Sequence, residues 1–192
     1  GNAKSYSKKI VEKMTKAGYS VQVFLLNAAS MGVPQKRERV FFIGSKKELN
    51  FPKLKLEFNE RAVVFGEVKS VTGARELNEY AYGKWLSAGE GGQLKGFGSN
   101  RRLSDKFVCN TVAGCQRKAG EAGLSHSTEA RHLNKTEYCL VGTFPLDYDF
   151  GVFGREDYKT GYLIGMSVPP VMTAQIANQM YLQWFENGKI TD

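Results

Sequence analysis

The stretch Gly32-Val-Pro-Gln-Lys-Arg-Glu-Arg-Val-Phe-Phe-Ile-Gly44 carries the most informative pattern in the chain. A Gly-Val-Pro turn leads into an extended segment, where successive side chains point to opposite faces. Gln35, Arg37 and Arg39 therefore share one face, and Val40–Ile43 then predicts a buried strand. Two fixed guanidinium groups at the mouth of a core indicate a site for an anionic or acceptor-rich ligand. The plainer interpretation is a solvated basic strand end.

Composition narrows the class of protein. The chain has 192 residues, 42% of them hydrophobic, which is enough to bury the core of one good-sized domain or two small ones. The net charge of +8 and the pI near 9.3 favour a polyanionic partner, most simply nucleic acid. No apolar run approaches the ~20 residues that span a bilayer, and no signal-peptide pattern opens the chain. We therefore expect a cytoplasmic protein without membrane partners.

The cysteines and histidines give no metal signal. Cys109, Cys115 and Cys139 are odd in number and lack the C-x-x-C spacing, so we expect reduced packing thiols. His126 and His132 lie apart from any cluster with metal-ligand spacing. We therefore predict no metal site.

The first 45 residues have an α/β pattern. A helix capped by Ser5 or Ser7 and ended by Gly18 is expected first. The segments Val21–Leu26 and Val40–Ile43 are then typical of strands. This order fits the edge of a three-layer α/β sheet, although two strands and one helix cannot close such a core.

Residues 45–127 are rich in glycine and predict an irregular region, with short strands at Ala62–Phe65 and Phe107–Val112. Basic and aromatic residues alternate through it. Such mixing suits nucleic acid, because cations meet phosphates while rings meet bases. An ordinary loop-rich subdomain with solvated charges explains the pattern equally well. The residues concerned are Tyr80, Tyr82, Lys84, Trp85, Lys95, Phe97, Arg101, Arg102 and Lys106.

The chain is helical again near its end. Ser167 is expected to cap this helix, with Pro169 and Pro170 in its first turn, and Asn187-Gly188 to end it. A wide apolar stripe indicates burial against a large surface. The stripe consists of Met172, Ile176, Met180 and Trp184, beside Ala177, Tyr181 and Phe185.

Together these residues resemble the C-terminal half of bacterial and phage DNA (cytosine-5) methyltransferases over nearly the whole chain. The segment 32–44 is similar to the family's Gln-x-Arg-x-Arg motif. Cys109-Asn-Thr-Val112 is similar to a short Asn-Thr element, and Arg131–Glu137 with Phe144-Pro145 and Tyr148 to the ninth conserved block. Gly165-Met-Ser-Val-Pro-Pro170 resembles the tenth block. Four such elements in the family's order, around a variable basic region, carry the resemblance.

The resemblance implies active-site roles. Arg39 would donate to a flipped cytosine and help to hold the catalytic carboxylate, Arg37 would orient the nucleophile loop or a phosphate, and Gln35 would support both. An extruded base needs fixed hydrogen bonds in place of its lost pairing. In the tenth block, Gly165, Ser167 and Val168 would contact S-adenosylmethionine. Met166 stands where the family usually has Asn.

The resemblance also implies duplex DNA as the main partner, read through residues of roughly 46–127. The predicted DNA-contacting residues are Lys84, Lys95, Arg101, Arg102, Thr111 and Arg131. Two alternatives stay open: a DNA-binding module that has no catalytic partner, and a tRNA cytosine-5 methyltransferase. The sizeable variable region favours DNA, because the tRNA branch has a shorter one.

Three catalytic blocks of the family are missing: the Phe-Gly cofactor loop, the Pro-Cys-Gln nucleophile and the Glu-Asn-Val carboxylate. No cysteine in the chain follows a proline. We therefore expect a fragment or a subunit of a split enzyme, which is inactive alone and needs an N-terminal catalytic half.

The predicted fold is α/β: a partial Rossmann-like methyltransferase sheet edge with a smaller, loop-rich, mixed target-recognition domain. The predicted boundaries are 1–45 for the catalytic part, 46–160 for target recognition and 161–192 for a helix that returns to the catalytic domain. Such a protein would flip bases and belong to a restriction-modification system.

Overall fold

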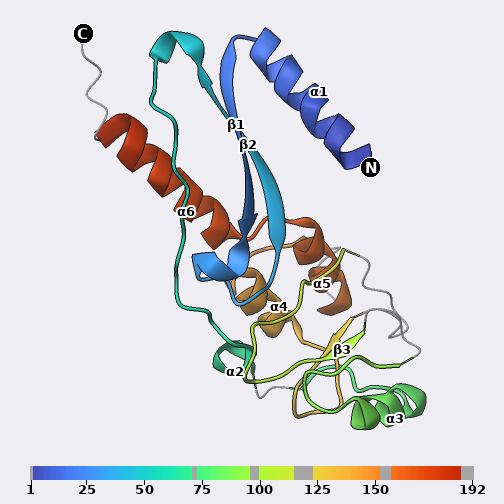
Figure 1. Cartoon of the computed structure of the whole chain (residues 1–192). Helices are drawn as coiled ribbons and strands as arrows, with labels where there is room; N and C mark the ends of the chain where they lie inside the picture. The colour runs from blue at the N-terminus through green and yellow to red at the C-terminus, as the bar shows by residue number, and fades with distance from the viewer. Residues whose placement is uncertain (1, 71–72, 96–99, 115–122, 152–156, 187–192) are drawn as a thin grey trace. The chain divides into compact units, whose positions relative to one another are not determined.

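A computed structural model describes residues 2–70, 73–95, 100–114, 123–151 and 157–186 (Figure 1). The chain forms two compact units. The first comprises residues 1–26, 38–58 and 174–192, and the second comprises 27–37 and 59–173. The Gln-x-Arg part of the first motif thus groups with the second unit, which is the larger of the two. The domain boundaries of the sequence analysis stay a prediction.

The first unit begins with helix α1 (Asn2–Lys16). The predicted caps were wrong: because the helix already begins at Asn2, Ser5 lies inside it and cannot cap its start. The predicted end was correct. Gly18 has a φ of 90°, which favours glycine, and its N–H donates to the carbonyl of Thr15.

Strands β1 (Tyr19–Asn27) and β2 (Glu38–Lys46) confirm both predicted strands. They pair and run in opposite directions, with α1 alongside (Figure 1). A Cβ on Gly44 would lie 2.8 Å from the Met14 methyl group, so glycine lets α1 approach the pair closely. The pair is covered only in part: Leu26 and Ile43 are buried. Most of its other apolar side chains are half-buried or exposed, as Val23, Leu25 and Val40 show at 47%, 66% and 49% exposure.

Helix α6 (Pro170–Tyr181) continues into one π-helical turn, Leu182–Glu186. In the first unit, its buried residues include Trp184, which stacks on Phe51 at 5.3 Å and donates to the carbonyl of Pro52 at 2.9 Å. The apolar stripe is thus partly confirmed: Met172, Ile176 and Trp184 are buried, whereas Tyr181 and Phe185 are exposed. The predicted end at Asn187-Gly188 lies outside the described residues.

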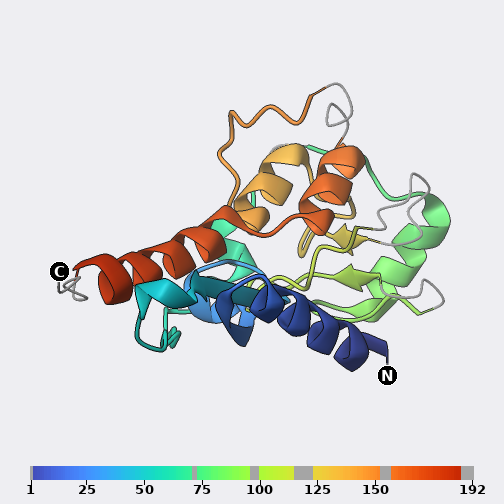
Figure 2. The same ribbon diagram turned by 90° about the horizontal axis from the view of Figure 1, so that it is seen from above.

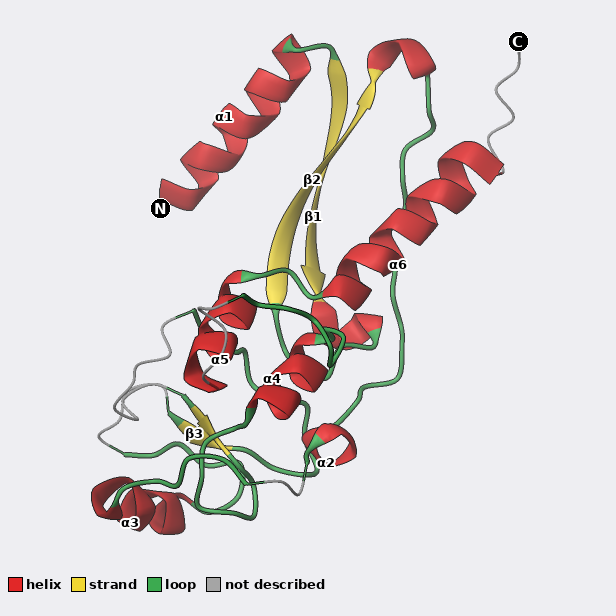
Figure 3. Cartoon of the chain, turned by 180° about the vertical axis from the view of Figure 1, so that it is seen from behind, coloured by secondary structure: helices red, strands yellow, loops and turns green. Residues whose placement is uncertain are grey.

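The second unit contains short elements joined by long loops (Figure 3). They are the 3-10 turn η1 (Ala28–Met31), α2 (Phe65–Val68), α3 (Glu79–Ala88), β3 (Arg101–Arg102), β4 (Leu124–Ser125), α4 (Lys135–Gly142) and α5 (Asp157–Met166). β3 and β4 pair in parallel. The core is formed by Phe65, Leu103, Cys109, Val112, Leu124, Leu133, Tyr138, Cys139, Val141 and Ile164.

Helices α4 and α5 pack side by side in this core (Figure 2). Two glycines permit the close approach. A Cβ on Gly161 would lie 2.7 Å from the Tyr138 ring, and one on Gly142 would lie 2.6 Å from Ile164. Helix α4 starts with a capping box, in which Asn134 and Glu137 each accept the other's backbone N–H.

Three predictions for this unit were wrong. Ala62–Phe65 is not a strand, since Phe65 begins α2, and Phe107–Val112 contains only one isolated bridge, between Cys109 and Gln35. Ser167 does not cap α6, because its hydroxyl donates to the carbonyl of Ile164 at the end of α5. Helix α3 was not anticipated, although its cap Asn78 is the expected type.

Candidate functional site

Arg37 is the centre of the site in the second unit. Its side chain is buried, with only 1% exposure, and it lies at the end of the Pro-Gln-Lys-Arg segment. Nη1 donates to the carbonyl of Val112 at 2.9 Å, and Nη2 donates to the carbonyls of Gly165 and Ser167 at 2.6 and 2.7 Å. One guanidinium therefore joins three segments that are far apart in the sequence. We call this arrangement the Arg37 clamp.

Gln35 reinforces the Arg37 clamp. Its buried amide oxygen accepts from the N–H of Val112 at 3.1 Å and from Nη1 of Arg37 at 3.3 Å. Its amide nitrogen donates to the carbonyl of Val141. The backbone adds a further bond, because the N–H of Lys36 donates to the carbonyl of Cys109 at 2.8 Å. The Gln-x-Arg segment and the Cys109–Val112 segment are thus held together by both side chains and backbone.

Gly165 lets the tenth-block segment approach the backbone of Ala113 closely. A Cβ on Gly165 would lie 2.4 Å from the backbone of Ala113, so only glycine allows this approach. The carbonyls of Gly165 and Ser167 point at Arg37, while Met166 and Val168 have 60% and 39% of their surface exposed. The backbone of the segment therefore faces inward, and these two side chains remain accessible.

Arg39 lies in the first unit, on β2. It is half-buried, and its Nη1 donates to the carbonyl of Glu38 at 2.7 Å. Burial lowers the pKa of Arg39 from its ordinary value, yet an arginine stays charged in proteins. Since this is the one hydrogen bond of its guanidinium to the described residues, most of its donors remain available for a ligand.

The burial of the Gln-x-Arg segment supports the one-face interpretation. Gln35 and Arg37 are buried, and Lys36 and Glu38 are exposed. Both Nη atoms of Arg37 are bonded, and its Nε is buried without a hydrogen-bond partner among the described residues. In this conformation Arg37 offers no exposed donor to a phosphate. Its bonds favour a positioning role.

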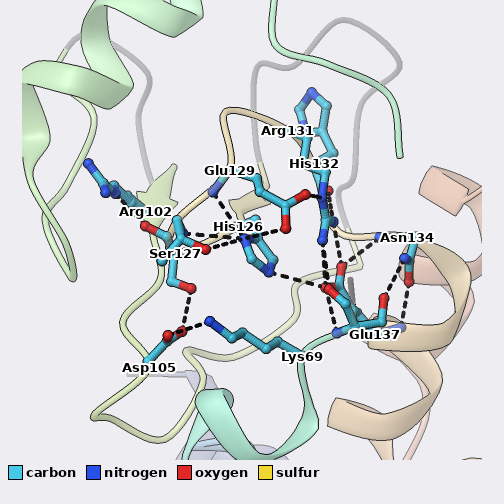
Figure 4. Close-up of polar contacts among 12 residues, drawn as sticks. Lys69, Arg102, Asp105, His126, Ser127, Glu129, Arg131, His132, Asn134 and Glu137 are labelled. Atoms are coloured by element: carbon cyan, nitrogen blue, oxygen red, sulfur yellow. Dashed lines mark hydrogen bonds and ion pairs between the residues drawn. The ribbon is translucent and has the colours of Figure 1, made fainter. Parts of the chain in front are cut away.

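A second buried charge, Arg131, lies at the start of the ninth block (Figure 4). Its guanidinium pairs with both carboxylate oxygens of Glu137, at 2.8 and 3.0 Å, and its Nε donates to Glu129 at 2.6 Å. It also donates to the carbonyls of Ser70 and His132. The side chain of Arg131 is only 4% exposed. This contradicts the prediction that Arg131 contacts DNA: all three of its nitrogens are used inside the unit.

His126 lies against the same cluster, with 1% exposure. Its Nδ1 accepts from the N–H groups of Thr128 and Glu129, which places the proton of the neutral ring on Nε2, 3.4 Å from Glu137. Burial lowers the pKa of His126 below 6.5, and Arg131 lowers it further, while Glu137 and Glu129 act in the opposite direction. Folding therefore favours the neutral ring.

The remaining predicted DNA contacts have different surroundings. Lys95 is exposed, and Lys84 on α3 is half-buried, with its ammonium 5.4 Å from the Tyr80 ring centre. Thr111 is exposed, but its hydroxyl donates to the carbonyl of Lys36. Arg101 and Arg102 are half-buried on β3. The structure thus leaves four cations of the predicted set accessible.

A groove of about 560 Å³ lies beside the start of α3. It could not be predicted from the sequence, because its walls come from two segments, 73–82 and 129–131, that are far apart in the chain. Three carboxylates on its walls make it a poor phosphate site. The lining residues are Gly73, Ala74, Glu76, Leu77, Glu79, Tyr82, Glu129, Ala130 and Arg131.

The described cysteines do not resemble nucleophiles. Cys109 and Cys139 are buried free thiols, and burial raises the pKa of both. A buried thiol with a raised pKa carries little thiolate and is inert. Cys115 lies outside the described residues. The described part of the chain contains neither a cluster of three potential metal ligands nor a helix long and apolar enough to cross a membrane.

Replacing Arg37 with Lys tests the Arg37 clamp. An ammonium lacks the planar fork that reaches three carbonyls, so at least one buried carbonyl is left unbonded, at a cost of about 1–3 kcal/mol in unfolding free energy. Arg39→Lys, the matched control on β2, is expected to cost under about 1 kcal/mol. Urea denaturation of both variants measures this. Equal losses would refute the Arg37 clamp.

The depressed pKa of His126 predicts an acid-sensitive second unit. The unfolded ring has a pKa near 6.5. The stability contribution of the neutral ring is therefore complete above pH 6.5 and is lost as the pH falls through the lower folded value. Burial and Arg75 lower the pKa of His132 too, so part of this slope belongs to it. His126→Gln should flatten the dependence of unfolding free energy on pH just below 6.5. An unchanged slope would contradict the conclusion that the buried, neutral His126 contributes to this pH dependence.

Comparison with known proteins places this geometry in a family. Residues 2–182 match the family model of C-5 cytosine-specific DNA methylases. The chain is 40% identical over 193 residues to the type II methyltransferase M.AplI of Arthrospira platensis, covering 92% of this chain and 52% of the relative. It is 26% identical to M.MthTI of Methanothermobacter thermautotrophicus, covering 90% and 59%.

Solved structures agree on the fold. A prophage-encoded DNA modification methyltransferase of E. coli superimposes with a TM-score of 0.74 at 15% identity, over 95% of this chain and 66% of the other. The methyltransferase EhMeth of Entamoeba histolytica gives 0.66 at 12% identity, over 91% and 57%. These likenesses confirm the predicted partial methyltransferase fold. The chain spans about half the length of the curated relatives that it matches over most of its own length, and it belongs to the C-5 cytosine-specific DNA methylase family.

Proposed function

We propose that this chain is the part of a DNA (cytosine-5) methyltransferase that recognises the target and completes the active site. The Arg37 clamp carries this proposal. It holds the Gln-x-Arg segment, the Cys109–Val112 segment and the tenth block together, and these are three of the four elements on which the resemblance rests. The whole enzyme would transfer a methyl group from S-adenosylmethionine to carbon 5 of a flipped cytosine.

In this proposal Arg39 is the residue that contacts the substrate. Thiolate attack on carbon 6 of cytosine places negative charge on the ring, and a fixed donor stabilises that charge as it develops. The guanidinium of Arg39 has one hydrogen bond to the described residues and retains free donors for the base and for the catalytic carboxylate. Arg37 and Gln35 do not contact the substrate in this proposal. They are positioning residues, because they fix the segment that leads into β2.

The tenth-block segment suits the edge of a cofactor site in part. Its accessible surface is apolar, from Met166 and Val168, and fits a thioether chain or an adenine edge. The hydroxyl oxygen of Ser167, which donates to Ile164, keeps lone pairs to accept with. S-adenosylmethionine would supply the activated methyl group when bound. The residues of this chain would hold one side of it, and the rest of the site is proposed to come from the missing half.

The exposed apolar surface of the first unit supports a partner. A two-stranded pair is marginal in water by itself, and here Val23, Leu25 and Val40 stay largely exposed. On α1, Tyr6 and Ile10 are exposed as well. We propose that the N-terminal catalytic half, in the same native chain or as a separate subunit, adds strands to this pair and covers these side chains.

Reconstitution tests the proposal. Neither half should transfer tritiated methyl groups alone, and a mixture with an N-terminal half that carries the Pro-Cys-Gln loop should do so. Arg39→Ala should reduce transfer by about 100-fold or more, in line with the loss of one charge-stabilising donor. Arg61→Ala, on an exposed arginine paired with Glu67, is the control and should stay active. Wild-type transfer by the Arg39→Ala mixture would refute the role of Arg39.

Binding competition separates the remaining alternatives. If the substrate is duplex DNA, a specific duplex should compete better than tRNA, and affinity should fall with salt by a slope of roughly −0.9 per neutralised phosphate. Preferential binding of tRNA would support the tRNA alternative. Specific duplex binding without any transfer in the mixture would support a non-catalytic DNA-binding module.

A further inference from the structure

We infer that Arg102 is a specificity-determining residue, which reads a guanine through its O6 and N7 atoms in the major groove of the target DNA. This inference rests on the proposed function and deepens it, since it names one base and the residue that selects it. The observation that carries it is a guanidinium held on two sides, whose third side has no hydrogen-bond partner among the described residues.

The plane of the Arg102 guanidinium is fixed by Trp85. The central carbon of the guanidinium lies 3.7 Å from the centre of the indole ring. A cation over an indole face is attracted by the ring electrons, and at this separation the guanidinium has too little room to stand edge-on to the ring. Trp85 is itself held: it is 5% exposed, and its Nε1–H donates to the carbonyl of His126 at 3.0 Å.

The inner edge of the guanidinium is fixed by Ser127. Nε of Arg102 donates to the carbonyl of Ser127 at 2.7 Å. The Ser127 hydroxyl in turn donates to Asp105, which pairs with Lys69 at 2.5 Å. Arg102 is thus supported by a chain of buried and half-buried polar groups. Little side-chain entropy remains to be lost when it binds a ligand.

The outer edge of the guanidinium carries Nη1 and Nη2. Among the residues that the structure describes, none bonds to Nη1 or Nη2 of Arg102. Figure 4 shows the side chain directed away from the buried cluster of Arg131 and Glu137. Two parallel N–H donors in a fixed plane match the two acceptors on the major-groove edge of guanine, the commonest specific contact of arginine with DNA.

Three other described arginines of the second unit lack this arrangement. Arg37 and Arg131 are buried and bonded through both Nη atoms, and Arg61 pairs with Glu67. Arg101 is the neighbour of Arg102 on β3, and successive side chains of a strand point to opposite faces. Arg101 therefore provides a matched control with the same charge and nearly the same position.

A phosphate also offers two acceptors, and the experiment separates the two ligands. The full chain is first used to select its preferred duplex from a random library. Binding is then measured for Arg102→Ala, Arg102→Lys and Arg101→Ala, and for the wild-type protein on duplexes in which each guanine in turn is replaced by 7-deazaguanine. That base lacks N7, so this arm needs no altered protein. Thermal melts confirm that each variant folds.

We expect Arg102→Ala to bind the preferred duplex about 10- to 100-fold more weakly and to lose the preference for guanine at one position. Replacement of that guanine by 7-deazaguanine should weaken binding by the wild-type protein. Arg102→Lys should restore affinity only in part. Arg101 is itself predicted to contact DNA, so Arg101→Ala should weaken binding evenly over all duplexes and keep the preference for guanine.

Two other outcomes would overturn the inference. A uniform loss over all duplexes, with a salt slope smaller by about one and no effect of 7-deazaguanine, would identify a phosphate contact. An unchanged preference in Arg102→Ala would remove the residue from recognition. If the wild-type chain selects no duplex at all, the proposed function fails first, and the inference falls with it.

Discussion

The buried positive charge of Arg37 organises the loops that meet around it in the second unit. Among the described residues, no carboxylate accepts a hydrogen bond from Arg37. Its charge is balanced by the dipoles of three backbone carbonyls and one amide. A buried cation is costly unless its donors are satisfied, and buried carbonyls are costly unless they accept. The guanidinium and the carbonyls of the Arg37 clamp therefore each need the other as a hydrogen-bond partner. The loops that carry them lack regular hydrogen bonding and acquire a defined geometry around Arg37.

Part of this could be predicted from the sequence. Alternation along a strand placed Gln35 and Arg37 on one buried face, and the β1 and β2 segments were identified by their apolar runs. The fold class followed from the same pattern and from the order of the conserved blocks. What the pattern could not give was the partner of Arg37, because the carbonyls of Val112 and Gly165 lie 75 and 128 residues away in the chain. Strand and helix were also confused around Phe65, where a short apolar run fits both.

The sequence likewise could not show which of the basic residues have partners that are distant in the chain. Arg102 and Arg131 are both arginines in a loop-rich basic region, and both were predicted to contact DNA. Glu137 and Glu129 bond to Arg131, whereas Trp85 and Ser127 hold Arg102, whose Nη atoms have no hydrogen-bond partner among the described residues. The fold thus makes Arg131 part of the internal structure, whereas the reading of a ligand by Arg102 is our proposal. The amino-acid composition of the region does not distinguish these two kinds of arginine.

The most direct test of the central claim is nuclear magnetic resonance of the arginine side chains in the ¹⁵N-labelled chain, with Arg37→Lys for assignment. If Arg37 clamps three carbonyls, its Nη hydrogens should give separate signals at neutral pH and exchange slowly with water, as those of Arg131 should. If the Arg37 signals are averaged and exchange as fast as those of a solvated arginine, the clamp does not exist in solution, and the account built on it is wrong.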